Sequence, residues 1–94
     1  MPEYQVAHIR EQGVDLIIVP LVSAFGIKSD RGQNRQIQEL QTRAEAAGLR
    51  GTVVPVWDNG GGKMAFMAPP RWGAFFRTLT LSRVNANLNR VLAW

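Results

Sequence analysis

Residues 14–22 read VDLIIVPLV, and this nearly continuous apolar stretch decides the fold. Many of its side chains are β-branched, which favours an extended strand. A strand with one face in water alternates apolar and polar residues, whereas here both faces are apolar, as in a strand buried on both sides. Pro20 has no amide hydrogen, so we expect the strand to bulge there or to turn that position away from a neighbour.

The residues upstream predict a hairpin partner for this strand. Residues 3–10 (EYQVAHIR) alternate loosely between two sets of side chains, as in a strand with one wetter face. Between the two segments, Gly13 allows the chain to reverse, because glycine adopts positive φ without a steric penalty.

The residues downstream predict a loop and then a helix. After the loop 23–30 (SAFGIKSD), apolar side chains recur at steps of three and four residues, which is the period of an amphipathic helix. They are Ile37, Leu40, Ala44 and Ala47. Ser29 or Asp30 is suited to cap the start of this helix, and Gly48 followed by Leu49 is typical of a Schellman ending.

The second half of the chain predicts a further hairpin and a C-terminal helical element. Residues 52–57 (TVVPVW) favour a third strand, residues 58–62 (DNGGG) a hairpin loop, and residues 63–68 a fourth strand. Beyond these, we expect a helix over about residues 71–77 and a second helix or a short strand over residues 84–93, because the apolar period there fits either.

Together these elements predict an α+β fold. The order is ββαββ plus the C-terminal helical element: a four-stranded, mostly antiparallel sheet with the helices packed on one face. Residues 23–50 are expected to form a right-handed crossover. At 94 residues, we expect residues 1–94 to form one small domain.

The composition argues against several classes of site. Without cysteine there is no disulfide or thiolate metal site, and His8 is the single histidine, so we predict no metal and no cofactor. The apolar run 16–22 is far shorter than the roughly 20 residues that span a bilayer. Acidic residues precede it where a secretory signal has basic ones, so we expect a cytoplasmic protein without membrane contact.

The positive charge lies in the C-terminal part of the chain. Residues 1–58 carry six basic and seven acidic groups, a balance of −1, whereas residues 59–94 carry five basic groups and no acidic one, a balance of +5. Aromatic residues are concentrated in the same part, so it is a candidate surface for single-stranded nucleic acid. The residues of this hypothesis are Lys63, Arg71, Trp72, Arg77, Arg83 and Arg90.

Two glycine-containing segments are candidate anion sites. The segment 58–63 (DNGGGK) fails the phosphate-loop pattern, because the first glycine and the final Ser or Thr are missing, and we interpret it as a hairpin tip. Lys28, Arg31 and Gly32 precede or begin the predicted helix, where unpaired amides and cations favour an anion.

We predict no catalytic residue, because no nucleophile pattern accompanies His8. Asp15 is expected to face solvent beside the Gly13 turn. The tryptophans and phenylalanines of residues 57–94 are expected to fill the core or an oligomer contact, and Trp94 is expected to pack on this copy or on another.

The sequence therefore favours a non-enzymatic interaction domain that self-associates, with a homodimer as the expected form. A small domain with an open sheet edge gains protection and core area when two copies pair. Two alternatives remain: the nucleic-acid-binding module described above, and a small-ligand or enzymatic pocket. Such a pocket would be lined by Tyr4, His8, Trp57 and Trp72.

Overall fold

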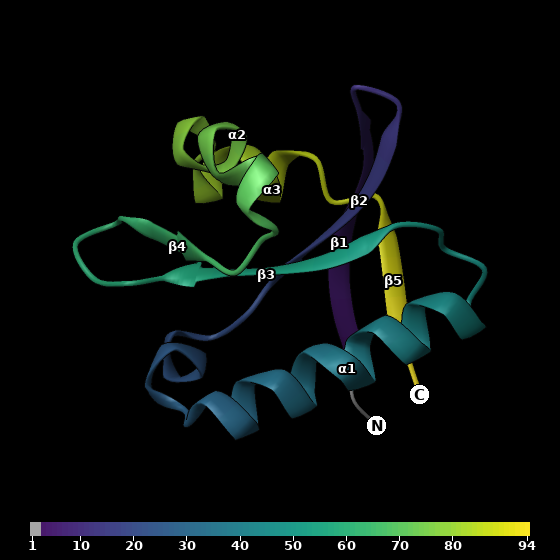
Figure 1. Ribbon diagram of the computed structural model, residues 1–94, viewed down its shortest axis with the longest axis horizontal. Coiled ribbons are helices and arrows are strands. Elements are labelled where there is room, and N and C mark those ends of the chain that lie inside the picture. Colours follow the sequence, from purple (N-terminus) through teal and green to yellow (C-terminus); the bar gives the residue numbers. More distant parts are fainter. Residues whose placement is uncertain (1–2) are drawn as a thin grey trace.

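The apolar stretch forms the central strand of a five-stranded sheet in the computed structural model, which describes residues 3–94 (Figure 1). The strand order is β4-β3-β2-β1-β5. β2 pairs antiparallel with β1 and parallel with β3, while the outer strands β4 and β5 pair antiparallel with β3 and β1. The strands are β1 (Glu3–Glu11), β2 (Val14–Pro20), β3 (Thr52–Asp58), β4 (Met64–Phe66) and β5 (Arg90–Ala93).

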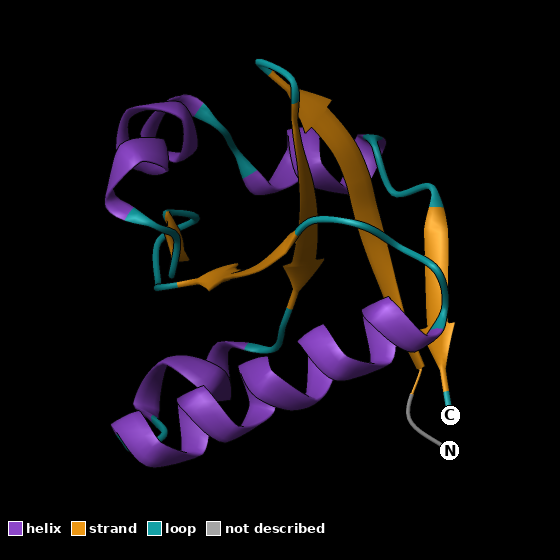
Figure 2. Ribbon diagram, turned by 45° about the vertical axis from the view of Figure 1, so that its right-hand side comes forward, coloured by secondary structure: helices purple, strands orange, loops and turns teal. Residues whose placement is uncertain are grey.

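Helices cover both faces of this sheet, so the expectation that they pack on one face is wrong. The long helix α1 (Asp30–Ala46) covers one face, and the short helices α2 (Gly73–Thr78) and α3 (Leu81–Ala86) cover the other (Figures 1 and 2). The physical reason lies in β2. Leu16 and Ile18 belong to the apolar cluster under α2 and α3, whereas the alternate residue Ile17 belongs to the cluster under α1.

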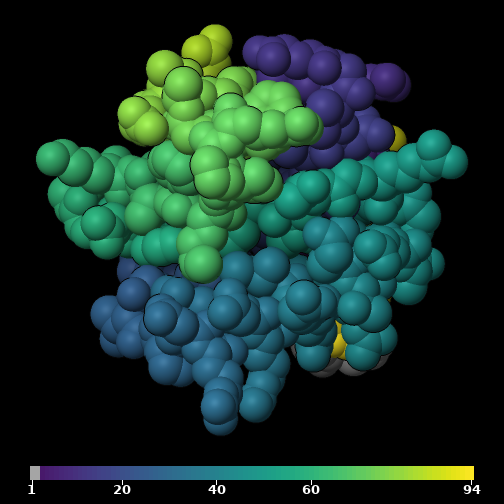
Figure 3. Space-filling model, viewed as in Figure 1, coloured from purple at the N-terminus to yellow at the C-terminus, as the bar shows by residue number. Residues whose placement is uncertain are grey.

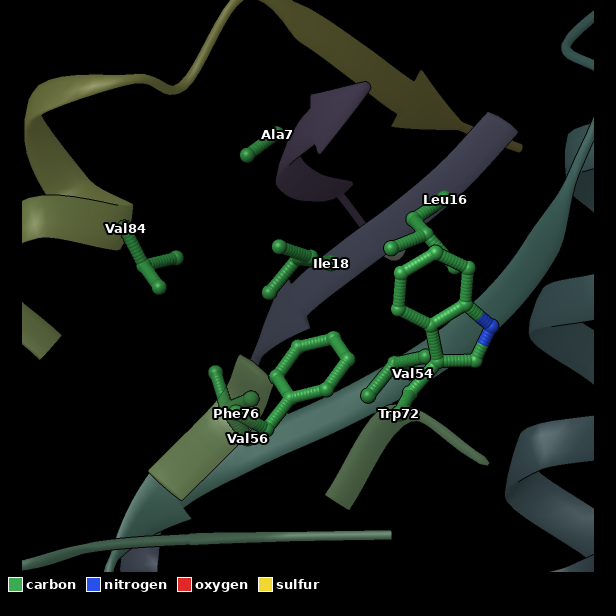
Figure 4. Close-up of a cluster of buried hydrophobic side chains, with 8 residues drawn as sticks. All are labelled: Ala7, Leu16, Ile18, Val54, Val56, Trp72, Phe76 and Val84. Atoms are coloured by element: carbon green, nitrogen blue, oxygen red, sulfur yellow. The ribbon is translucent and has the colours of Figure 1, made fainter. Parts of the chain in front are cut away.

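The aromatic residues of the C-terminal half supply much of the second apolar cluster. Trp72 ends a short 3-10 turn, η2 (Pro70–Trp72), and Phe76 lies on α2. Both side chains point onto Leu16, Ile18 and the neighbouring strands (Figure 4). Trp72 is 6% exposed and Phe76 is 1% exposed. The expectation that these rings fill a core is therefore confirmed.

The connection from β2 to β3 confirms the predicted helix and both of its ends. The chain leaves β2 through a 3-10 turn, η1 (Ser23–Ile27), and the Ser29 hydroxyl then accepts the Gly32 amide at 3.1 Å as the helix cap. At the other end, the Leu49 amide donates to the Ala44 carbonyl at 2.9 Å and Gly48 has φ +81°. This is the Schellman ending that the sequence predicted.

The last residues of the chain correct the predicted strand count from four to five. The single helix or strand expected over residues 84–93 is in fact two elements: α3, which begins earlier, at Leu81, and the strand β5, which covers only Arg90–Ala93. Asn89 joins this strand to β1. Its side-chain oxygen accepts the His8 amide at 2.8 Å, and its side-chain nitrogen donates to the His8 carbonyl at 3.0 Å. The side-chain amide of Asn89 thus binds the backbone groups of His8 just before β5 begins, next to the pair of Val6 with Arg90.

Gly51 allows the chain to enter β3 against the backbone of β2. Its φ is +127°, which is sparsely populated by residues with a side chain, and a Cβ there would lie 2.5 Å from the Asp15 carbonyl oxygen. Gly61 in the β3–β4 turn also has positive φ, at +62°, but a Cβ there would meet nothing within 4 Å. An added Cβ is therefore strained at both positions by the backbone conformation, but it clashes with a neighbouring residue only at Gly51.

Replacing Gly51 by alanine is therefore expected to lower the free energy of unfolding by about 3 kcal/mol or more, because strain and overpacking add. Gly61→Ala is expected to cost only about 1 kcal/mol, from backbone conformation alone. Urea denaturation of the two variants measures both values. Equal losses would show that Gly51 does not pack against β2 as described.

Asn89→Asp tests the bridge between β1 and β5. A carboxylate still accepts the His8 amide but cannot donate to the His8 carbonyl, which it would instead repel. The expected loss is about 1 to 2 kcal/mol in unfolding free energy, whereas Asn85→Asp, an equivalent change on the exposed surface of α3, is expected to change it by less than about 0.5 kcal/mol. Thermal unfolding at matched concentration compares them, and equal stabilities would contradict the bridge.

Candidate interaction surface

The outer edge of β5 is the clearest candidate for an interaction surface. Within residues 3–94, β5 lies at the end of the strand order and is bonded to β1 alone (Figure 2). Leu92 points into the cluster under α1 and is 2% exposed, whereas Val91, on the opposite face, is 56% exposed. The strand therefore presents backbone groups along its edge and a β-branched apolar side chain beside them.

Small residues of α1 lie next to this edge. A hollow of about 220 Å³ lies between the end of α1 and β5, and its wall includes Ala46 and Ala47. Trp94 follows β5 at the same place, where its ring stacks on Tyr4 at 5.6 Å between centroids and lies 5.1 Å from the Arg43 guanidinium. As expected, Trp94 packs, and its contacts are on this copy of the chain.

The opposite edge of the sheet offers less. β4 has three residues, all half-buried, and it follows a glycine-rich turn in which Gly60, Gly61 and Gly62 all have positive φ. The predicted fourth strand, residues 63–68, is thus shorter than expected. Its continuation leaves the sheet toward η2.

The basic residues of the nucleic-acid hypothesis do not converge on one surface. Lys63 lies in the β3–β4 turn and Arg90 in β5, at opposite ends of the strand order. Arg71, Arg77 and Arg83 share the layer formed by η2, α2 and α3. The Arg71 guanidinium lies 5.3 Å from the Trp72 ring, but that ring is 6% exposed and packs in the core.

Two of the three residues of the predicted anion site are hydrogen-bonded within the chain, and the third is exposed on α1. The Lys28 ammonium donates to the Gln36 side-chain oxygen at 2.7 Å, and the Gly32 amide donates to Ser29. Arg31 is exposed in the first turn of α1. Lys28 and Gly32 nevertheless line a common groove with Tyr4.

The four residues of the predicted pocket are separated in the fold. Trp57 packs edge-on against Phe25 with centroids 5.0 Å apart, on a different part of the sheet from Tyr4 and its partner Trp94. Its indole nitrogen is buried and has no hydrogen-bond partner among residues 3–94. The remaining member, Trp72, belongs to the core under α2 and α3.

His8 and Asp15 have structural surroundings. The His8 Nε2 lies 2.8 Å from the Arg50 carbonyl oxygen, so Nε2 is the donor and the ring ties β1 to the segment that enters β3. Asp15 is half-buried near the start of β2, opposite Arg10 of β1. In the part of the chain that the structure describes, no three metal-ligating side chains come together. No helix of residues 3–94 has the length and apolar character needed to cross a bilayer.

Comparison of the chain with family models, with curated proteins and with solved structures found no match.

Proposed function

We propose that this chain is a non-enzymatic interaction domain that forms a homodimer by antiparallel pairing of β5 with β5 of a second copy. The observation that carries the proposal is the open β5 edge, with Val91 56% exposed beside it. Unpaired backbone groups on an outer strand are a template for another strand. Proteins commonly cover, charge or pair such an edge. In β5 an exposed apolar side chain, Val91, lies beside the edge.

The rest of the sheet favours this edge over the others. Beyond Val6, the outer side of β1 is closed at His8 by the Asn89 side chain. β4 is shorter and half-buried, and after one further bond, from the Met67 amide to the Pro55 carbonyl, the chain turns into η2. β5 is longer, and of its four residues Leu92 is buried while Arg90, Val91 and Ala93 are exposed.

Symmetry restricts the register of such a dimer. Antiparallel pairing of two identical edge strands uses a two-fold axis perpendicular to the sheet, so each face of one sheet continues the same face of the other. Residues directly opposite each other lie on the same face, so the two-fold axis pairs one residue of the strand with its own copy. In the proposed register this residue is Val91, the exposed apolar one. Ala46 and Ala47 lie beside β5 and leave room for the second copy to approach.

The expected dimer is weak, because the strand has four residues. Interfaces that bury less than about 1,200 Å² are commonly transient, and dissociation constants in the micromolar range are typical of them. The domain would then exchange between monomer and dimer as its concentration changes.

Nucleic-acid binding has less support as an alternative. Stacking on bases requires exposed rings, and Trp72 is buried. The positive charges near it are those of Arg71, Arg77 and Arg83, and the guanidinium of Arg71 lies over the Trp72 ring in a cation–π contact. Lys63 and Arg90 lie at opposite ends of the sheet, so they do not form one binding surface for a nucleic-acid strand.

Val91→Lys is expected to weaken the dimer at least tenfold, because it places two like charges directly opposite each other at the axis. Val22→Lys is the matched control: it makes the same change at a valine that is 74% exposed and outside β5. Sedimentation velocity over about 10 to 500 μM spans the expected dissociation constants. Melting temperatures confirm that both variants fold.

Monomeric wild-type protein throughout that range would contradict the proposal. So would equal weakening by Val22→Lys and Val91→Lys, because the contact would then not be specific to the β5 edge.

A further inference from the structure

A groove runs between α1 and the start of β1, beside the C-terminal residue. Its volume is about 420 Å³, within the range of small-molecule sites. In Figure 3 the C-terminal end of the chain, in yellow, is visible at the surface next to α1. The groove is lined by Tyr4, Lys28, Gly32, Arg35, Gln36, Glu39, Leu40 and Trp94.

One wall of the groove is an aromatic platform. The Tyr4 and Trp94 rings stack with an interplanar angle of 21°, and both are half-buried and line the groove. Because the Arg43 guanidinium lies over the Trp94 ring, the surface of the pair left for a ligand is the Tyr4 ring and the edge of Trp94. Leu40, which is 1% exposed, also contributes to the lining. Planar apolar surface of this kind favours an aromatic ligand, which stacks or packs edge-on against it.

The other wall is polar and predominantly positive. Arg35 and Glu39 lie one turn apart on α1, and both line the groove. Lys28 stands at the start of this wall, where its bond to Gln36 holds the ammonium in place. Two cations and one carboxylate thus face the groove, an arrangement that is complementary to a ligand with an anionic group and hydroxyl or amine donors.

We infer that this groove binds a nucleoside monophosphate. The base lies against the Tyr4–Trp94 pair, the phosphate contacts Lys28 and Arg35, and the Glu39 carboxylate accepts hydrogen bonds from ribose hydroxyls. A single nucleotide fits this groove better than a nucleic-acid strand does. The two rings stack on each other and form one platform, whereas proteins that bind a strand stack successive bases on several separate rings. The groove is built from one copy of the chain, so the inference does not depend on dimer formation.

The test is calorimetric titration of the full chain with AMP, adenosine and inorganic phosphate, at low ionic strength. AMP is expected to bind at least about tenfold more tightly than either of the others, because adenosine lacks the phosphate that contacts Lys28 and Arg35, and inorganic phosphate lacks the base and the ribose. Binding of AMP is expected to weaken as salt is added, since exposed charges are screened. Tryptophan emission should change on binding in wild-type protein and not in Trp94→Phe, because Trp57 and Trp72 are buried elsewhere.

Charge-removing variants locate the phosphate. Lys28→Gln and Arg35→Gln are each expected to weaken AMP binding about threefold, the size typical of exposed charge contacts. Arg31→Gln is the matched control, because Arg31 is an exposed arginine of the same helix that does not line the groove. Its affinity for AMP should equal that of wild type.

Three results would overturn the inference: no AMP binding up to about 5 mM, equal affinity for AMP and adenosine, or equal weakening by Arg31→Gln and Arg35→Gln. A fourth is an affinity for a six-nucleotide single strand far above that for AMP, because the ligand would then be a polymer.

Discussion

Burial of β2 on both faces is the constraint on which the rest of the structure depends. Leu16, Ile17, Ile18 and Val19 are each at most 1% exposed, and burying such side chains contributes roughly 1.5 to 3 kcal/mol apiece. One layer of helices protects only two of the four, so α1 must lie on one side and α2 with α3 on the other. In a chain of 94 residues this coverage is concentrated at the centre of the sheet, and β5 remains open at its edge.

The same demand for cover determines what the aromatic and basic residues can do. Trp72 and Phe76 cap Leu16 and Ile18, so they are unavailable for display on the surface. Beside the arginines near them, the half-buried ring of Phe75 remains, in a hollow that Arg71 also lines, although the sequence places several rings and cations in the same third of the chain. The exposed apolar side chain of Val91 and the half-buried pair of Tyr4 and Trp94 are apolar groups that the folded chain presents at its surface.

The sequence predicted the local elements better than their arrangement. The Ser29 cap and the Gly48–Leu49 ending of α1 followed from rules that involve neighbouring residues. By contrast, β5 has only four residues, and it pairs with residues far upstream: Val91 lies opposite Gln5, 86 positions earlier. The period of so short a segment fits a helix as well as a strand, and the sequence does not show its distant partner. The apolar run in β2 already indicated burial on both faces, and placing all helices on one face was inconsistent with it. Of the residues that line the groove, Lys28 and Gly32 were predicted as part of an anion site, but the pair of Tyr4 with Trp94 was not, because these two residues come from opposite ends of the chain.

Residue-resolved amide hydrogen exchange, measured at several protein concentrations, tests the account most directly. The amides of β2 should exchange slowest at every concentration, because this strand lies inside the sheet with helices on both faces. In β5, protection should rise with concentration, while β4 at the other edge should show no such change. Fast exchange in β2, or a concentration-dependent gain confined to β4, would contradict the doubly covered sheet or the choice of its open edge.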